Sequence, residues 1–496
     1  MTSRPRRNGV GASLRSSTFG RQHVREVVAA SVFLAIAITT AHAVNAPMST
    51  DSVSALLTHG VRMHGARERA QDVRKFLSER SIDSASIPHH EVSTLADAGP
   101  GSLRAAIDAA NAEPGMALIE FAPSLQGRID LTGTALVIVD SVAIMGPGAE
   151  RLTVDGGNQR PVFWTGQRDN DHRAEIFIAG LTISGGSAPS GGGISSYYSN
   201  LTLADCVIRD NNTSNALSEK YGGGVYQYEG SLHIDRCLIR GNSAGSFGGG
   251  VAVQDGTLTV QDSKIDSNLA LRGGGIHADT QGTVELRRSF VGYNQASRRG
   301  GGIDIAARGA PALLENLTVA ENYVRGEAPD DAGGGIWLGG SGTLRLSTIS
   351  VNRLFNHPRD EQSAAGVHFD GPGRLELGSN IIAFNPVANG NVDFGSRAGT
   401  VDAYCNIVHS PASQALDEND DRTLGGVDPL LQPLADNGGA TLTMAIAGDS
   451  PARDHACNFT YTDQRGFPRR SASDNRIDIG AYEYGADRVF ANGFDS

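Results

Sequence analysis

Apolar and polar residues alternate in short segments through the middle of the chain, and a glycine pattern recurs with them. Between residues 191 and 367, three consecutive glycines followed by Ile or Val begin every 25 to 33 residues. The copies occupy residues 191–194, 222–225, 248–251, 273–276, 300–303 and 333–336, with a weaker seventh at 364–367. Alternation with a period of two predicts strands with one inward face, so each repeat is expected to form one coil of a solenoid.

An asparagine recurs in phase with the glycines, after each alternating segment. Its copies are Asn211, Asn242, Asn268, Asn294, Asn322, Asn352 and Asn385. Because Asn tolerates left-handed backbone angles, it suits a tight bend. In coils stacked at about 4.8 Å, these side chains are expected to form an internal ladder of amide hydrogen bonds. The pattern predicts an all-β parallel β-helix with regular coils over residues 180–390, since helical repeats would not tolerate glycine triplets.

The segments that flank the regular coils have different patterns. Residues 44–91 form a polar extension with helical spacing, in which Val73, Phe76 and Leu77 share one face. Ser102 is a suitable N-cap for a short helix over 103–111, which would cover the open first coil. Strands are expected at 117–121, 128–131, 136–138, 142–145 and 152–155. The β-helix is thus predicted for 92–410, followed by an acidic loop at 411–426 and a C-terminal cap and tail at 427–496.

The first 43 residues have the pattern of a secretory signal peptide. Six arginines precede an apolar run at 27–38, and Ala41-His42-Ala43 forms a small-x-small cleavage site. The run is short for a membrane span, although a single N-terminal anchor is the alternative. Cleavage removes six Arg and one Glu and changes the formal net charge from −12 to −17, which argues against a nucleic-acid partner. No later apolar stretch is long enough for a membrane helix, so no integral membrane domain is expected after cleavage.

Four cysteines form two candidate pairs. Cys206 and Cys237 hold equivalent positions in consecutive coils, so either a disulfide or two buried thiols fits. Cys405 and Cys457 lie outside the glycine repeats and are expected to pair in an oxidising compartment.

No cofactor is predicted, and one segment carries enough carboxylates to hold Ca²⁺. The acidic residues of this loop are Asp417, Glu418, Asp420 and Asp421. They lack the spacing of an EF-hand, so a solvated loop is the preferred interpretation.

Two columns of residues are expected to point outward from the coils. If the Ile or Val of each repeat points inward, the residues one and three positions after it are expected to face solvent. The first column is Ser195, Tyr226, Ala252, His277, Asp304, Trp337 and His368. The second column is Tyr197, Tyr228, Gln254, Asp279, Ala306, Gly339 and Asp370.

Parts of these columns have residue types suited to glycan chemistry. His277, Asp279 and Asp304, beside Arg272 and Arg299, are the candidate catalytic residues, since carboxylates and imidazole perform acid–base work on glycans and arginine can neutralise a uronate. Candidate ligand-binding residues are Tyr197, Tyr226, Tyr228, Trp337, His368 and Asp370. Exposed strand faces are normally polar, so a binding or purely structural face is the alternative, and it is the preferred one.

Several motifs resemble those of secreted bacterial right-handed parallel β-helix proteins. The run LADAGPGSLRAAIDAAN at 95–111, with IEFAP at 119–123 and IMGPG at 144–148, is similar to their CSLREA-type N-terminal segment. The glycine repeats resemble polymorphic outer-membrane-protein-like repeats, and TDQRGFPR at 462–469 with DIGAYE at 478–483 resembles the choice-of-anchor Q-type C-terminal segment. Relatives often carry Cys where this chain has Ile477, which favours Cys405 as the partner of Cys457.

The resemblance implies a pectin-lyase-like fold in a protein that is secreted or held at the cell surface or outer membrane of a Gram-negative bacterium. The first functional hypothesis is a binding, adhesive or structural role, toward a polysaccharide or cell-surface glycan. The alternative is a polysaccharide lyase or glycoside hydrolase that acts on the outward face of the helix, so enzyme activity is left open.

Overall fold

The computed structural model describes residues 61–166, 173–213, 220–326, 328, 331–355, 363–412, 416, 422–457, 460–469 and 476–486. The predicted signal peptide at 1–43 and the four acidic residues of the candidate Ca²⁺ loop lie outside these ranges. Within them, no helix is both long and apolar enough to cross a membrane.

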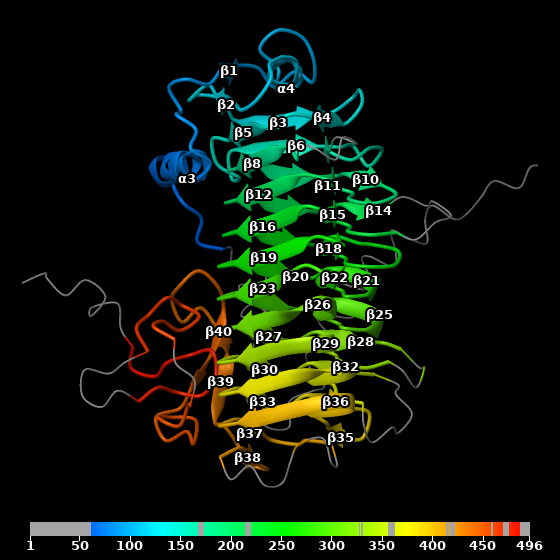
Figure 1. The fold of residues 1–496 in the computed structure, drawn as a ribbon, viewed down its shortest axis with the longest axis vertical. Helices are drawn as coiled ribbons and strands as arrows, with labels where there is room; N and C mark the ends of the chain where they lie inside the picture. The colour runs from blue at the N-terminus through cyan, green and yellow to red at the C-terminus, as the bar shows by residue number, and fades with distance from the viewer. Residues whose placement is uncertain are drawn as a thin grey trace, which may run out of the picture. The chain divides into compact units, whose positions relative to one another are not determined.

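Parallel strands stacked coil on coil form a right-handed β-helix of about 11 turns (Figure 1). Three stacks of strands run along it, which we call sheets A, B and C. Sheet A has 18 strands and sheet B has 12, while sheet C is a 6-stranded stack continued by a separate strand pair. The predicted fold class is therefore confirmed.

The strand bounds follow the coil repeat. Sheet A contains β1 (His89–Val92), β2 (Ala117–Phe121), β4 (Leu136–Ile138), β5 (Val142–Met145), β7 (Phe163–Thr165), β8 (Glu175–Ala179), β11 (Ile194–Tyr197), β12 (Asn200–Ala204), β15 (Val225–Tyr228), β16 (Ser231–Asp235), β18 (Val251–Gln254), β19 (Thr257–Gln261), β22 (Ile276–Thr280), β23 (Val284–Arg287), β26 (Ile303–Glu315), β29 (Ile336–Arg345), β32 (Val367–Gly378) and β36 (Phe394–Tyr404). Sheet B contains β3 (Gly127–Asp130), β6 (Leu152–Asp155), β9 (Thr182–Ser184), β13 (Val207–Arg209), β17 (Leu238–Arg240), β20 (Lys264–Asp266), β24 (Phe290–Gly292), β27 (Thr318–Ala320), β30 (Thr348–Ser350), β33 (Ile381–Ala383), β37 (Ile407–Val408) and β38 (Leu424–Gly425). Sheet C contains β21 (Leu269–Arg272), β25 (Gln295–Arg299), β28 (Tyr323–Val324), β31 (Arg353–Leu354), β34 (Pro386–Val387) and β35 (Gly390–Asn391), and it is continued by β10 (Ser187–Ala188) with β14 (Asn212–Thr213). An antiparallel pair, β39 (Leu431–Ala435) and β40 (Thr443–Ile446), completes the strands.

Each glycine triplet makes the bend that leads into sheet A. The first glycine takes a left-handed conformation, with φ of +64° at Gly248. A Cβ on the second, Gly249, would lie 2.4 Å from the carbonyl oxygen of Gly274 in the next coil. A Cβ on the third, Gly250, would lie 3.1 Å from Nδ2 of Asn268. The triplet and the phased asparagine are therefore two parts of one packing constraint.

The predicted asparagine ladder is confirmed. In a typical rung, Nδ2 of Asn242 donates to Oδ1 of Asn268 at 3.0 Å and to the carbonyl oxygen of Ile208 at 2.9 Å. The backbone N–H of Asn242 donates to the same Oδ1 at 3.0 Å. All the rungs are buried, and each amide is fully paired, as buried polar groups require.

The ladder ends on a carboxylate that the sequence analysis did not include. Asn385 donates through Nδ2 and through its backbone N–H to Oδ1 of Asp393, at 2.7 and 2.8 Å. Oδ2 of Asp393 accepts from the backbone N–H of Ser410 at 2.8 Å. Since no further rung follows to accept a hydrogen bond, an acceptor-only group suits this last position.

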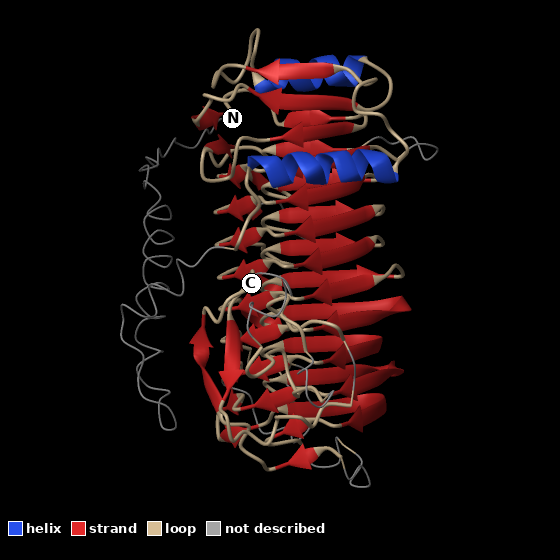
Figure 2. Cartoon of the chain, turned by 90° about the vertical axis from the view of Figure 1, so that its left-hand side faces the viewer, coloured by secondary structure: helices blue, strands red, loops and turns tan. Residues whose placement is uncertain are grey.

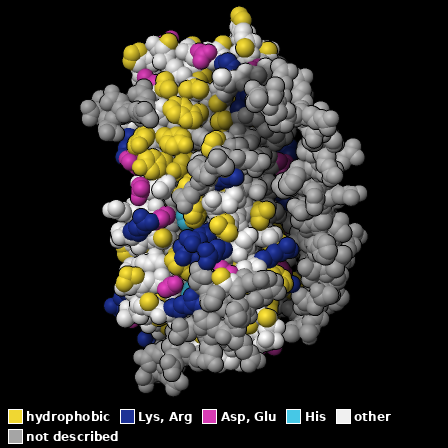
Figure 3. Space-filling model, turned by 90° about the vertical axis from the view of Figure 1, so that its right-hand side faces the viewer, with side chains coloured by type: hydrophobic (Ala, Val, Ile, Leu, Met, Phe, Trp, Pro, Cys, Tyr) yellow, Lys and Arg dark blue, Asp and Glu magenta, His cyan; other side chains and the backbone are white. Residues whose placement is uncertain are grey.

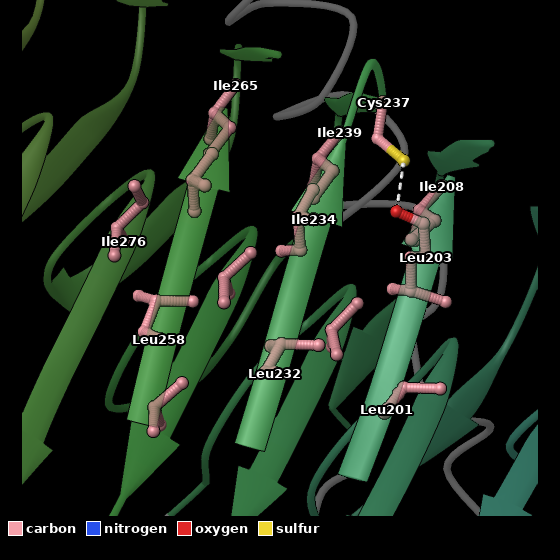
Figure 4. Close-up of a cluster of buried hydrophobic side chains, with 14 of the residues drawn as sticks. Leu201, Leu203, Ile208, Leu232, Ile234, Cys237, Ile239, Leu258, Ile265 and Ile276 are labelled. Carbon is pink, nitrogen blue, oxygen red and sulfur yellow. Dashed lines mark hydrogen bonds between the residues drawn. The ribbon is translucent and has the colours of Figure 1, made fainter. Parts of the chain in front are cut away.

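Aliphatic side chains fill the interior in columns of their own. Leu201, Leu232 and Leu258 are equivalent positions on successive strands of sheet A (Figure 4). Cys206 and Cys237 also lie inside, as free thiols, and the backbone N–H of Cys206 contacts Sγ of Cys237 at 3.4 Å. The structure thus has two buried thiols here and not a disulfide.

In the described part of the chain, two helices accompany the β-helix (Figure 2). Helix α4 (Leu103–Ala112) covers the first coil with Leu103 and Ile107, and Oγ of Ser102 accepts from the backbone N–H of Ala105 at 3.1 Å, as the N-cap prediction requires. Helix α3 (Ala66–Glu79) lies across the outside of sheet A, where the ring of Phe76 packs 5.0 Å from that of Phe177.

The predicted C-terminal cap lies against the side of sheet B instead of over its end (Figure 1, orange to red). Oε1 of Gln464 accepts from Oγ1 of Thr318 at 2.6 Å, and the backbone N–H of Ala481 donates to Oγ1 of Thr348 at 3.1 Å. Small hydroxyl side chains on β27 and β30 let this segment approach the strands closely. The disulfide between Cys405 and Cys457, with Cα atoms 5.8 Å apart, joins the segment to the coils.

Buried ion pairs hold the internal shape of this C-terminal segment. Asp463 and Arg465 close a turn, in which Nη2 of Arg465 lies 2.7 Å from Oδ2 of Asp463. Arg469 is fully buried, and its Nη2 donates to Oδ1 of Asn316 and to the carbonyl oxygen of Gly480, both at 2.7 Å. The segment is therefore a folded part of the protein.

Candidate functional site

The two predicted outward columns are in register along sheet A. Ser195, Tyr226, Ala252, His277, Asp304, Trp337 and His368 pair in that order from coil to coil. The same register extends the first column to Trp164 on β7, which pairs with Ser195. The coil of Trp164 has no glycine triplet to mark its phase, so the repeat pattern does not identify this residue.

The first column is buried, which corrects the expectation that it faces solvent. The exposed fraction is 5% for Tyr226, 4% for His277 and 0% for Asp304. The left-handed glycine bends the chain back over these residues. A Cβ on Gly300 would lie 2.7 Å from Cβ of Asp304, and one on Gly273 would lie 2.9 Å from Cβ of His277. Tyr197, Tyr228 and Asp279 of the second column are half-buried, as is Trp164 at the start of the first column.

Seven aromatic rings form a continuous band along the coils, which we call the aromatic stripe. Its members are Trp164, Tyr197, Tyr198, Tyr221, Tyr226, Tyr228 and Phe247. Ring centroids lie 6.1 Å apart for Trp164 and Tyr197, 6.4 Å for Tyr197 and Tyr228, and 4.8 Å for Tyr221 and Phe247. Tyr226 lies beneath, and the other six are half-buried. Figure 3 shows hydrophobic side chains gathered on the upper part of this face, with Lys and Arg below them.

A buried charged cluster continues the stripe. The ring of His277 packs 4.7 Å from Phe247, and its Nδ1 lies 3.3 Å from Oδ2 of Asp304. Nε of Arg299 contacts the same oxygen at 3.3 Å, and its guanidinium lies 3.5 Å from the centre of the Trp337 ring. Of the five candidate catalytic residues, the structure thus brings His277, Asp304 and Arg299 together.

The Asp304 carboxyl is held in its ionised form inside this cluster. Burial raises its pKa, but the hydrogen bond and charge of His277 and those of Arg299 outweigh burial, so the pKa lies below its ordinary value. A fully buried carboxylate held between His277 and Arg299 serves packing and charge balance, and it does not reach a ligand on the surface.

The side chains of Asp279 and Arg272 have other neighbours, although the backbone of Arg272 on β21 pairs with that of Arg299 on β25. Asp279 forms an ion pair with Arg308, which comes from an insertion within β26 that the repeat pattern does not contain. The guanidinium of Arg272 lies 5.8 Å from the Phe247 ring centre. The five candidate catalytic residues are therefore divided among three environments.

The remaining candidate ligand-binding residues differ in accessibility. Trp337 is 6% exposed and His368 is 0% exposed, so neither offers an open platform. Asp370 is half-buried and lies on β32, two residues after His368. Tyr197 and Tyr228 are the candidates that remain both aromatic and accessible.

One other group of the described residues has the composition of a metal site. Ligand atoms of His64, Asp72 and Asp205 lie within 4.8 Å of one another. The guanidinium of Arg236 occupies the space between the carboxylates, at 2.7 Å from Asp72 and 3.1 Å from Asp205. Because this cation already balances the acids, the group fixes α3 to the coils and does not fit a bound metal.

Two of the comparisons with known proteins found a match. The family model of the right-handed β-helix region matches residues 153–323. No curated protein matches the sequence. A crystal structure of pectate lyase Pel9A aligns over 81% of this chain and 98% of that chain, with 15% identity and a TM-score of 0.35. The family match and the stacked parallel strands define the class: this is a right-handed parallel β-helix protein.

Proposed function

We propose that this protein is an exported β-helix protein that binds an extended polysaccharide along the aromatic stripe. The observation that carries the proposal is the row of half-buried rings on successive coils, led by Trp164, Tyr197 and Tyr228. The ring centroids of these residues lie 6.1 and 6.4 Å apart from one coil to the next, so the rings form a row that an extended chain can follow.

Aromatic side chains suit this ligand because their flat faces pack against the apolar C–H faces of sugar rings. The stripe rings are not needed for the interior, which aliphatic residues fill from the opposite side of the same strands. Contiguous apolar surface that stays accessible marks a binding site more often than a structural one.

Binding is favoured over lyase or hydrolase activity by the position of the acid–base groups. Asp304 and His277 are buried beneath the bend, and Asp279 is neutralised by Arg308. A general acid or base has to come within hydrogen-bond reach of the substrate atom that it protonates or deprotonates. Burial of Asp304 and His277 and the engagement of Asp279 by Arg308 therefore support binding over catalysis.

Export is supported by two features of different kinds. The N-terminal pattern of arginines, apolar run and cleavage site is typical of a signal peptide. The pairing of Cys405 with Cys457 is the chemistry of an oxidising compartment. We therefore propose a secreted or surface location, with a polysaccharide or cell-surface glycan as partner.

Affinity electrophoresis through gels that contain soluble polysaccharides tests the proposal. We expect retardation by at least one polysaccharide, and a loss of affinity of at least about tenfold in the double variant Tyr197→Ala, Tyr228→Ala. The matched control is Tyr461→Ala, which removes a ring that is 83% exposed on the C-terminal segment. Unchanged binding in the double variant, or no retardation by any polysaccharide, would overturn the proposal.

The enzymatic alternative has its own test. Incubation with uronic-acid polysaccharides, followed by absorbance of unsaturated chain ends, detects β-elimination. We expect no such product. Product that forms with the native protein and disappears in Asp304→Asn would replace the binding proposal by a lyase.

A further inference from the structure

Carboxylates line one margin of the aromatic stripe. Tyr198, Glu229 and Asp255 occupy the same turn position in three successive coils, all in left-handed conformations with φ of 55°, 52° and 55°. Backbone hydrogen bonds stack these turns: the N–H of Tyr198 donates to the Tyr228 carbonyl at 2.9 Å, and the N–H of Glu229 donates to the Gln254 carbonyl at 2.9 Å. The acidic residues therefore directly follow the strands that carry the rings.

The negative field of these carboxylates reaches the stripe. Burial raises the pKa of Tyr228, and the charges of Glu229 and Asp255 raise it further. The pKa of Tyr226 is also raised, first by burial and then by its ring neighbours and Asp255. An environment that opposes a phenolate also opposes the carboxylate of a bound sugar.

Three arginines near the stripe have acidic partners, and a fourth, Arg272, lies 5.8 Å from the centre of the Phe247 ring. Arg299 is bound to Asp304 at 3.3 Å, and Arg308 is bound to Asp279. Arg173 lies 3.4 Å from Glu229 in a pair that is well exposed on both sides. The chain as a whole carries a formal charge of −12. At Tyr228 the side-chain carboxylates that raise the pKa are those of Glu229 and Asp255, so the local field at this ring opposes an acidic ligand.

We propose that the aromatic stripe selects neutral polysaccharides and rejects polyuronates and other acidic chains. This inference rests on the proposed function, because it names the chemical class of the ligand for that same site. Neutral sugar rings gain the apolar contact with Tyr197, Tyr228 and Trp164 without any electrostatic cost. An acidic chain would bring carboxylates beside Glu229 and Asp255, and like charges placed together at an interface are strongly disfavoured.

Two sets of soluble polysaccharides separate this inference from the proposed function. The neutral set is hydroxyethylcellulose, galactomannan, xyloglucan and dextran, and the acidic set is carboxymethylcellulose, polygalacturonate and alginate. In low-salt buffer we expect the tightest neutral chain to bind at least about tenfold more tightly than any acidic chain, with the gap narrowing in about 0.5 M salt as charges are screened. An acidic chain that binds as tightly overturns the inference and leaves polysaccharide binding intact. Binding to neither set overturns the proposed function itself.

Charge-removing variants test the physical cause. Asp255→Asn and Glu229→Gln are each expected to improve the affinity for acidic chains relative to neutral ones by roughly two- to fivefold. The matched control is Asp210→Asn, which removes an exposed acid from a left-handed turn with φ of 56° next to sheet B. Equal selectivity in the native protein and in both margin variants would contradict the electrostatic origin of the preference.

Discussion

Two rows of side chains run along the same coils, and they differ in how they repeat. The interior ladder uses one residue type from Asn211 to Asn385, because each amide has to match identical neighbours above and below. The first outward column changes at every coil, from Ser195 to Tyr226 to Ala252. Repetition marks positions that hold one coil to the next, and variation marks positions where each coil meets a different environment.

Deletion of one rung is the strongest way to test this comparison. In Asn294→Ala, the backbone N–H and Nδ2 of Asn268 lose their shared acceptor, and the carbonyl of Ile265 loses a donor. Buried polar groups left unpaired cost about 1–3 kcal/mol each, so we expect a loss of about 5 kcal/mol in unfolding free energy. Urea denaturation with hydrogen exchange around this coil measures it. The control Ser297→Ala, at an exposed position nearby, should change the unfolding free energy by no more than about 0.5 kcal/mol. A loss in this control as large as that in Asn294→Ala would show that the ladder position is not special.

Arg469 lies outside the coil repeat, and its replacement tests whether a residue that does not recur can also stabilise the fold. In Arg469→Met, Glu483 and Asn316 lose a fully buried partner, so we expect about 4 kcal/mol of destabilisation, confined to the C-terminal segment. Limited proteolysis should cut within residues 427–469, while hydrogen-exchange protection of the ladder stays at native values. Arg476→Met is the control at an exposed position in the same segment. Loss of ladder protection in the buried variant would show that segment and coils unfold as one unit.

The charged end of the ladder should respond to pH where the amide rungs do not. Burial raises the pKa of Asp393 to about 6, so the folded protein holds this proton more tightly than the unfolded chain does. The protonated Asp393 therefore stabilises the folded protein at low pH, and this contribution is lost as pH rises through about 6. We expect the unfolding free energy to fall by about 2 kcal/mol from this group between about pH 4.5 and about pH 7.5. Urea midpoints across this range should show this component in the native protein and lack it in Asp393→Asn. If the urea midpoints of the native protein and of Asp393→Asn change with pH in the same way, Asp393 is not the group responsible.

The smallest effect on stability is expected in the stripe. Tyr228 is half-buried and packs against Tyr197 and Tyr198 alone among the rings, so Tyr228→Ala should cost no more than about 1 kcal/mol. Polysaccharide affinity should nevertheless fall by about tenfold. Thermal unfolding and affinity electrophoresis on the same preparation give both values. A large loss of stability with unchanged polysaccharide affinity would show that Tyr228 serves the fold and not ligand binding.

The regular part of the fold was open to prediction because its contacts recur. Strands expected at 117–121, 136–138, 142–145 and 152–155 have those bounds in the structure, and the helix expected at 103–111 is Leu103–Ala112. The phased asparagines identified the ladder. The last acceptor, Asp393, escaped notice because it follows Asn385 by eight residues and not by a full coil.

The candidate site was predicted only in part. Alternation gave the correct column register, and His277, Asp304 and Arg299 do meet. Alternation says nothing about what covers a strand face, so it could not show that the glycine bend buries the first column. Trp164 and Arg308 come from places where the repeat is absent or interrupted, and no periodic signal marks them.

The sequence by itself determined the coil, its inward residues and the ladder, since each coil packs on a near copy of itself at a fixed spacing. A repeat in the chain is therefore a repeat in space. Only the tertiary structure decided which outward residues are covered and where the C-terminal segment lies. Gln464 meets Thr318 across 146 positions, and Arg469 meets Asn316 across 153. Such contacts occur once, between segments with no common pattern, so they depend on side-chain shape and charge after the coils have formed.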